Sequence, residues 1–223
     1  LNTAIRYVQN VRKPVSELDR YLNTRGYIGS DYLNDIVGTQ CLRNMRYKEA
    51  VEYLGAVSKA YQKHLNVYMD YDPFSIERKP IKLKSEFRYD FACKMYSLEQ
   101  SLDLTSEPNR KAQLLIEYAT GNSFDFCWGL TQYYRGTSYW GQVCEKRNWE
   151  KDEYTQTARG RAKELIKLAC DIVTDDEVAA EINYALCNYR TVADKYPNTK
   201  KGKLVIGQCD NLCDYHAESY RSR

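Results

Sequence analysis

Cys209, Cys213 and His216 have the types and spacing of metal ligands. Positions i+4 and i+7 lie within about 40° of position i on one face of an α-helix, and two thiolates with an imidazole suit Zn²⁺. A fourth ligand would have to come from elsewhere, and the only other histidine is His64. Three apolar residues share the same stripe: Val205, Leu212 and Tyr220. The sequence therefore favours a packing face with reduced cysteines, and it predicts no metal and no cofactor.

Aromatic side chains are more concentrated in segment 124–140 than anywhere else in the chain. Aromatic rings supply stacking surfaces for sugars and anchors for peptides. Tyr139 and Trp140 lie between Gly136 and Gly141, where we expect an exposed loop. The alternative is that most of these aromatics form a core between helices, with the tyrosine hydroxyls at the surface. The candidate binding residues are Trp128, Tyr133, Tyr139 and Trp140.

Asp70 and Asp72 flank Tyr71 and could hold a hard cation through their oxygens. Nothing like an EF-hand calcium loop follows them, so we expect solvated loop acids. The chain has no glycine-rich phosphate loop, no H-E-x-x-H helix and no G-x-S-x-G elbow. Both histidines, His64 and His216, lie in expected helices, and the 30 acidic residues single out no catalytic pair. We therefore expect a protein that is not an enzyme.

The 223-residue chain carries 33 basic and 30 acidic side chains, a net charge of +3. Nucleic-acid-binding proteins usually concentrate basic residues on one face, whereas the basic clusters at 159–163 and 195–203 are expected to be solvated helix faces and ends. We expect no nucleic-acid partner. No apolar run reaches the ~18 residues of a membrane span, so we expect no membrane-spanning segment. The 8 cysteines lie mostly on or near apolar stripes of expected helices, and most are predicted to be core thiols.

Apolar residues recur at three- and four-residue intervals through most of the chain, and strand-like alternation never persists. This pattern predicts helices. Thr174 and Glu177 have the spacing of a capping box and are expected to open one of them. Residues 70–82 contain Pro73 and Pro80 and predict a long connection. The expected helices cover 15–22, 30–41, 48–65, 87–102, 106–121, 124–134, 158–172, 174–196 and 200–220.

A pair of short helices folded back on each other is indicated in the first third of the chain. Gly38 allows a neighbouring helix to approach, and Tyr47 is expected in the turn. Ala50, Leu54 and Val57 then recur on one helix face. This arrangement resembles the tetratricopeptide repeat, a helix–turn–helix unit of about 34 residues that stacks on copies of itself. Four later residues resemble the second helix of such a unit and place a small residue at another close crossing: Ala185, Tyr189, Val192 and Pro197.

The resemblance implies an all-α fold, a right-handed α-α superhelix of stacked antiparallel helix pairs, with about nine helices in one domain over residues 1–223. Stacked repeats expose an extended concave surface. The resemblance therefore implies a non-enzymatic interaction scaffold that binds a protein segment on that surface. The alternative is a glycan-binding module of a bacterial cell-envelope lipoprotein, because outer-membrane glycan-binding lipoproteins of the starch-utilisation type also carry such helices. The oligomeric state stays open.

The sequences around Cys127-Trp128 and Cys209–Leu212 contribute to a resemblance that extends over the whole chain. With them, the chain is similar to uncharacterised bacterial proteins of the tetratricopeptide-like type, which tend to be large and exported. That likeness implies a periplasmic or cell-envelope location, with the export signal outside this chain. It also implies that the chain is the C-terminal part of a longer protein.

Overall fold

The structure is a computed structural model that describes residues 2–3, 5–6, 16–17, 20–21, 30–62, 72–74, 87–122 and 153–207. These residues form nine helices and no strand, which confirms the all-α prediction. None of the described helices has the length and apolar character needed to cross a membrane. The helices are α3 (Ser30–Arg43), α4 (Tyr47–Gly55), α5 (Lys59–Gln62), α6 (Phe87–Leu104), α7 (Pro108–Gly121), α10 (Glu153–Ile172), α11 (Asp176–Ala185), α12 (Tyr189–Lys195) and α13 (Lys200–Gly207).

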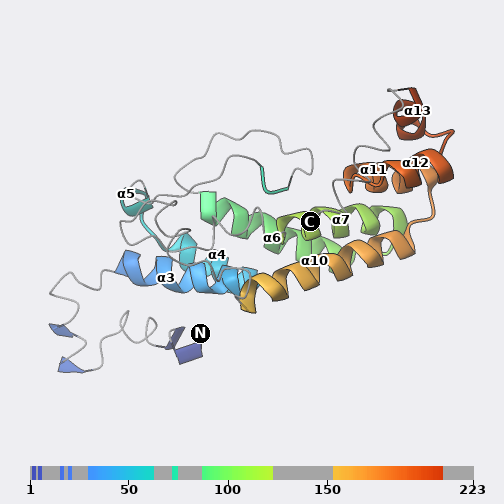
Figure 1. Cartoon of the computed structure of the whole chain (residues 1–223). Coiled ribbons are helices and arrows are strands. Elements are labelled where there is room, and N and C mark those ends of the chain that lie inside the picture. The colour runs from blue at the N-terminus through green and yellow to red at the C-terminus, as the bar shows by residue number, and fades with distance from the viewer. Residues whose placement is uncertain are drawn as a thin grey trace.

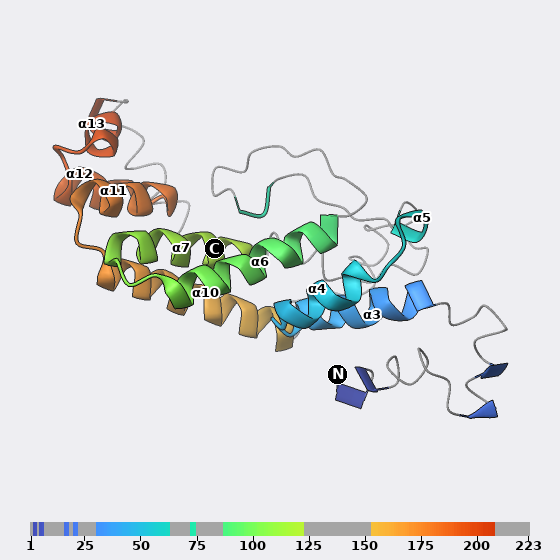
Figure 2. The ribbon, with the colours of Figure 1, turned by 180° about the vertical axis from the view of Figure 1, so that it is seen from behind.

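From α3 to α10, each of the longer described helices packs on the next of them along the chain. α3 packs on α4, α4 on α6, α6 on α7, and α7 on α10. α11 packs on α7 and on both α12 and α13, which also contact each other. Figures 1 and 2 show an elongated molecule with α3 and α4 at one end, α11 to α13 at the other, and α6, α7 and α10 between them. Apolar side chains of the packed helices are thereby buried against one another.

α3 and α4 form a hairpin with a tight crossing. A Cβ built on Gly38 would lie 2.6 Å from Leu54 Cγ, so the predicted close approach at this glycine is confirmed. Ala50, one turn before Leu54, is fully buried, as the close crossing expected there requires. Tyr47 was expected in the turn, but it is the first residue of α4 and its side chain is buried.

The turn between α3 and α4 is closed by a residue in the left-handed conformation. Met45 has a φ of 53°. The N–H of Arg46 donates to the carbonyl of Cys41 at 2.9 Å, and the N–H of Met45 donates to the carbonyl of Leu42 at 3.0 Å. These two bonds define a Schellman motif, in which glycine usually occupies the left-handed position.

α11 and α12 repeat this turn, so the single helix expected over 174–196 is wrong. Cys187 has a φ of 59°, and the N–H of Asn188 donates to the carbonyl of Asn183 at 2.9 Å. No glycine or proline marks this break, and the apolar periodicity continues across it. The sequence therefore carries no local signal for the two separate helices.

The break also corrects the role expected of Ala185. This residue ends α11 and is half-buried, so it does not belong to the second helix of a pair. The fully buried small residue of α11 is Ala180, which packs in one cluster with Val192 of α12 and Val205 of α13. The small residue at the crossing is thus in the first helix of the pair, as Gly38 is in α3.

The start of α11 differs from the expected capping box. Asp175, and not Thr174, is the N-cap, and its carboxylate accepts a backbone N–H of the first turn at 3.0 Å. Asn109 of α7 accepts the N–H groups of both Thr174 and Asp175 at 2.9 Å. Glu177 accepts the N–H of Lys200 at 3.1 and 3.2 Å and so caps α13 instead of its own helix. In a capping box, Thr174 and Glu177 would each accept the backbone N–H of the other residue. Here Asn109 accepts the N–H of Thr174, and Glu177 bonds to α13.

α4 is shorter than the helix expected over 48–65. It ends at Gly55, and α5 begins only after Ser58. Asp31 of α3 accepts the N–H of Ser58 at 2.8 Å and its hydroxyl at 2.6 Å. Side-chain bonds of this kind compete with helical backbone bonds. Asp31 therefore ties the residue directly before α5 to α3.

Candidate functional site

The four aromatic residues expected to bind a ligand lie outside the described residues: Trp128, Tyr133, Tyr139 and Trp140. The stripe of Cys209, Cys213 and His216 also lies outside them, as do His64 and Asp70. These assignments stay predictions.

Phe74 is the residue of the long connection that reaches the helices in the described part of the chain. Its ring stacks on that of Phe91 in α6, with centroids 5.4 Å apart and an angle of 28° between the planes. Lys94 Nζ lies 5.8 Å from the Phe74 centroid, within reach of a cation–π contact. On the α7 side, a Cβ built on Gly121 would lie 2.8 Å from Phe74 Cε1, so the absence of a side chain makes room for the ring. We call Phe91, Lys94 and Gly121 the Phe74 site.

A short turn presents Phe74 to this site. The carboxylate of Asp72 accepts the N–H of Phe74 at 2.9 Å, the bond of an Asx-turn. Pro73 between them has a fixed φ and is buried. Phe74 itself is only half-buried, whereas Phe91 beneath it is 3% exposed. Asp72 was expected to be a solvated loop acid, but it is half-buried and holds the turn.

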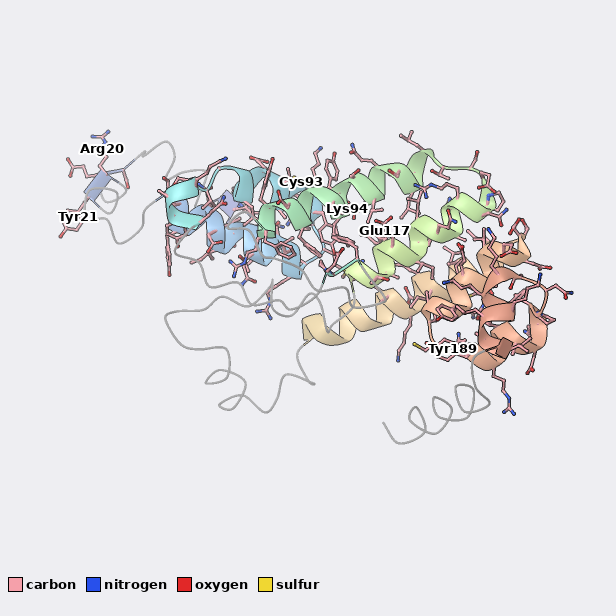
Figure 3. The ribbon with its side chains drawn as sticks, turned by 90° about the horizontal axis from the view of Figure 1, so that it is seen from above. Arg20, Tyr21, Cys93, Lys94, Glu117 and Tyr189 are labelled. Carbon is pink, nitrogen blue, oxygen red and sulfur yellow. The ribbon has the colours of Figure 1, made fainter. Side chains whose placement is uncertain are left out.

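Lys94 is held at the edge of the site by an ion pair. Its Nζ lies 2.7 Å from Glu117 Oε1 of α7, and the two side chains are 45% and 33% exposed. Figure 3 shows Lys94 and Glu117 on the neighbouring helices α6 and α7. The site therefore combines an apolar floor with a cation that remains accessible to water.

A chain of hydrogen bonds lies beneath the site. Tyr47 donates to Asn122 Oδ1 at 2.5 Å, and Asn122 donates to the carbonyl of Tyr118 at 3.2 Å. The hydroxyl of Tyr118 donates to Glu99 at 2.7 Å. The Tyr47 ring also meets Phe91 edge-on, with centroids 6.4 Å apart. These contacts join α4, α6 and the end of α7 and fix the floor of the Phe74 site.

Glu99 and Tyr118 have shifted pKa values with one main cause. Burial raises the pKa of Glu99, and the hydrogen bond from Tyr118 offsets part of that rise. Burial also raises the pKa of Tyr118, and its bond to Glu99 raises it further. A phenol with a raised pKa keeps its proton at neutral pH. The Tyr118 hydroxyl therefore acts as a stable donor in this chain of bonds.

A buried ion pair joins α3 to α6. Arg88 Nη1 lies 3.0 Å from Asp35 Oδ1, and the two side chains are 6% and 1% exposed. The same nitrogen donates to Thr39 Oγ1 at 3.1 Å. Burial raises the pKa of Asp35, while the charge of Arg88 opposes that rise. A buried charge without its partner is costly, so this pair favours the one arrangement of α3 and α6 in which the two groups meet.

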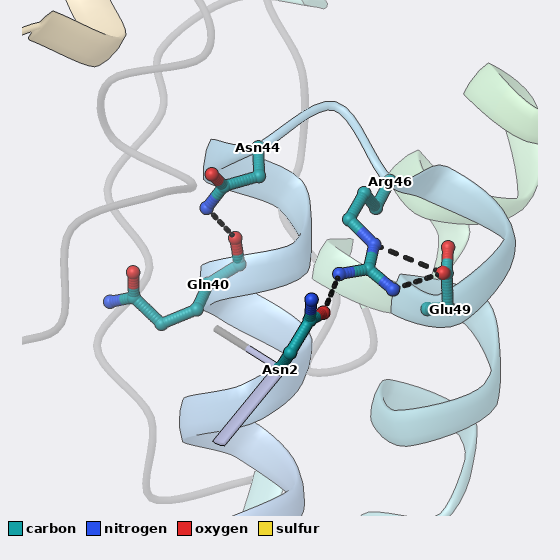
Figure 4. A network of polar contacts seen from close by, with 5 residues as sticks. All are labelled: Asn2, Gln40, Asn44, Arg46 and Glu49. Carbon is teal, nitrogen blue, oxygen red and sulfur yellow. Dashed lines mark hydrogen bonds and ion pairs between the residues drawn. The ribbon is translucent and has the colours of Figure 1, made fainter. Parts of the chain in front are cut away.

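A surface network ties the first described residues to the α3–α4 hairpin (Figure 4). Arg46 Nη1 donates to Asn2 Oδ1 at 2.8 Å, and its Nε donates to Glu49 at 3.0 Å. The hydrogen bond and charge of Arg46 lower the pKa of Glu49. Next to it, Asn44 donates to the carbonyl of Gln40 at 2.7 Å. This network links residue 2 and the first turn of α4 to the turn between the two helices.

The 4 described cysteines are all free, and three of them are less buried than the core position that was predicted for most of the cysteines. The other four lie outside the described residues and stay predictions. Cys41 is buried, Cys93 and Cys187 are half-buried, and Cys170 on α10 is exposed. Burial raises the pKa of the Cys41 thiol to about 11. Cys170 lies in a helix that was predicted from its apolar stripe. Whether a residue near such a stripe is buried depends on which neighbouring helices pack against that face.

Among the described residues, no group of three histidine, cysteine or acidic side chains could hold a metal ion. No protein-family model, no curated protein and no solved structure matches the chain.

Proposed function

We propose that the chain is a non-enzymatic interaction scaffold that binds a protein segment, and that its helix pairs form a right-handed, tetratricopeptide-like superhelix. The serial packing of α3, α4, α6, α7 and α10 supports this proposal. In repeat proteins each unit contacts its neighbours in the chain, and the stack exposes an extended surface for a ligand.

The observation that carries the proposal is the crossing of α3 and α4. The repeat pattern has a glycine in its first helix, and an alanine followed four residues later by a large residue in its second. Gly38 lies against Leu54, and Ala50 is fully buried one turn before it. The Schellman turn at Met45 recurs at Cys187 in the α11–α12 pair, which adds support for a repeated unit.

A protein segment is favoured as the ligand because α6 and α7 already hold one. The turn of Asp72 to Phe74 packs on these helices through an aromatic ring. Aromatic anchors in well-packed surroundings supply much of the energy of protein–protein interfaces. The same helices can therefore offer such a surface to a partner.

Selection from a random peptide library, with a glycan array in parallel, tests the proposal on the full chain. We expect peptides with a shared motif to be enriched, and crosslinks from the bound peptide to fall on α3, α4, α6 or α7. Binding of glycans without any enriched peptide would overturn the proposal in favour of the glycan-binding alternative. Hydrolysis or modification of the bound ligand would overturn the non-enzymatic part.

Two tryptophan variants test whether the expected aromatic residues take part. Trp140→Ala is expected to leave the melting temperature nearly unchanged and to weaken the selected ligand, because Trp140 is predicted at the edge of the binding surface. Trp149→Ala is the matched control, because Trp149 is not among the four candidate binding residues, and we expect it to bind as the parent does. Loss of about 3–5 kcal/mol of stability in Trp140→Ala would instead assign Trp140 to a core.

A further inference from the structure

We propose that the Phe74 site recognises an aromatic side chain of a partner segment, and that the chain's own turn of Asp72 to Phe74 occupies this site in the free protein. The inference rests on the proposed function and names the kind of segment that is bound. The segment has an aspartate–proline–aromatic turn, because that is the chemistry the site already holds.

Three features of the site select an aromatic ring. Phe91 offers a flat face for stacking, and a nearly parallel ring already lies on it at 5.4 Å. Lys94 brings a cation to 5.8 Å from the ring centroid. An aliphatic side chain in the same place would make no cation–π interaction with it. Gly121 has no side chain, and a Cβ there would lie 2.5 Å from Met95 Sδ and 2.8 Å from the Phe74 ring, so glycine is what allows both groups to come this close. The site therefore favours phenylalanine or tyrosine over leucine.

The occupant is attached in a way that permits exchange. The hydrogen bond that shapes the turn is internal, between Asp72 and the N–H of Phe74. The stacking and cation–π contacts with α6 are made by the Phe74 ring, which is half-buried, and Pro73 beside it is buried. A free segment with the same turn could make all of these contacts, and no described helix would have to unwind for the exchange.

The covalent connection sets how strongly the internal turn competes. A tethered ligand acts at an effective concentration that reaches the millimolar range for short flexible linkers. A free segment then binds only the fraction of molecules in which the site is open, and its apparent dissociation constant rises in proportion. Removing the Phe74 ring should remove this competition and leave Phe91, Lys94 and Gly121 unchanged.

The experiment uses a fluorescent peptide with the sequence of residues 70–76 as the probe and the full chain as the receptor. Anisotropy titrations compare the parent chain with Phe74→Ala. We expect the probe to bind Phe74→Ala at least about tenfold more tightly than the parent, because the internal competitor is gone. A probe with alanine in place of its phenylalanine should not bind, and one with leucine should bind more weakly than the original.

Matched variants at the edge of the site test the role of the cation. Lys94→Met keeps the alkyl stem and removes the charge, and in the Phe74→Ala background it is expected to weaken the probe several-fold. Glu117→Gln breaks the same 2.7 Å ion pair but keeps the Lys94 charge, so it should bind the probe as well as Phe74→Ala alone. Equal losses in both variants would overturn the cation–π part of the proposal.

Folding is checked by circular dichroism and thermal melting before each titration. Phe74→Leu, which keeps an apolar side chain, serves if Phe74→Ala does not fold, and we expect it to bind the probe more tightly than the parent. Equal affinity of a folded Phe74 variant and the parent would overturn the inference, even if the library selection finds peptide ligands elsewhere on the chain. Tight binding of the probe to the variant, with no ligand for the parent in that selection, would leave the site as the seat of the internal turn and would overturn the proposed function, because no partner segment would then displace that turn.

Discussion

Gly38 in α3 and Leu54 in α4 pack so closely that the space for a side chain on Gly38 is already filled. A Cβ there would lie 2.6 Å from Leu54 Cγ, 2.7 Å from its Cδ2 and 3.1 Å from its backbone nitrogen. A leucine tip can rotate away, but a backbone nitrogen moves only with its helix. The contact therefore sets how closely the two helices approach.

Gly38→Ala should destabilise the protein by about 1–3 kcal/mol through overpacking, although alanine is the better helix former. Gly160→Ala in α10 is the control, because a Cβ on Gly160 would meet nothing within 4 Å. That variant should gain about 1 kcal/mol from helix propensity. Urea denaturation measures both, and a stabilised Gly38→Ala would contradict the crossing.

Arg88→Met should cost about 3–5 kcal/mol, because it leaves the Asp35 carboxylate buried without its partner. The double variant Asp35→Leu/Arg88→Met removes both charges and should recover most of that stability. A double-mutant cycle by chemical denaturation gives the coupling. If Arg88→Met and the double variant are equally unstable, the loss comes from packing and not from an unpaired charge.

Arg161→Met provides the matched control for that cycle. Arg161 and Glu164 are 3.5 Å apart on α10, but their side chains are 53% and 72% exposed. Exposed pairs of this kind contribute roughly 0–1 kcal/mol. A loss comparable with that of Arg88→Met would show that the buried location of the Asp35 pair has no special importance.

Glu177→Ala should loosen α13 by about 0.5–1 kcal/mol, because the Glu177 carboxylate accepts the first N–H of that helix. Glu181→Ala removes an exposed acid from the same helix, α11, without that contact, and should be nearly neutral. Hydrogen exchange at the amides of α13 is the measurement. Protection that is unchanged in Glu177→Ala would contradict the capping role.

Glu99→Gln should change how stability depends on pH. Burial raises the pKa of Glu99 in the folded state, so ionisation is harder there than in the unfolded chain. The wild type therefore loses stability as pH rises through the folded-state pKa, while the glutamine variant does not titrate. The stability of Glu99→Gln relative to the wild type should therefore rise as the pH increases above about 4.5, the ordinary pKa of glutamate. A constant difference above that pH would contradict the shift.

Thiol labelling should distinguish two of the described cysteines. Cys41 is buried with a pKa of about 11, whereas Cys170 is exposed. Only the thiolate reacts with alkylating reagents. Iodoacetamide on the native protein, followed by peptide mass mapping, should therefore modify Cys170 long before Cys41. Comparable rates would mean that Cys41 is reached by solvent in the folded state.

Helices were predictable wherever a long apolar stripe ran between clear stops. The stripe over 87–102 became α6, and Pro108 and Gly121 marked both ends of α7. The break at Cys187 was not predictable, because a non-glycine residue takes the left-handed conformation there. The Phe74 site was missed as well. The sequence signal for this site was Asp72-Pro73-Phe74, a turn sequence that ends in an aromatic residue. Only the structure shows that Phe91 and Gly121 lie next to Phe74.

The sequence by itself determined the helical class, because the three- and four-residue spacing of apolar residues and the scarcity of strand-like alternation can be read from short stretches of the chain. It also determined the close approach at Gly38, because a residue without a side chain allows two packed helices to come closer together. Only the tertiary structure decided that Asp35 meets Arg88 and that Glu177 caps α13. The physical reason is that partners of buried charges and helix ends come from distant segments, and their distance in the folded chain is set by packing.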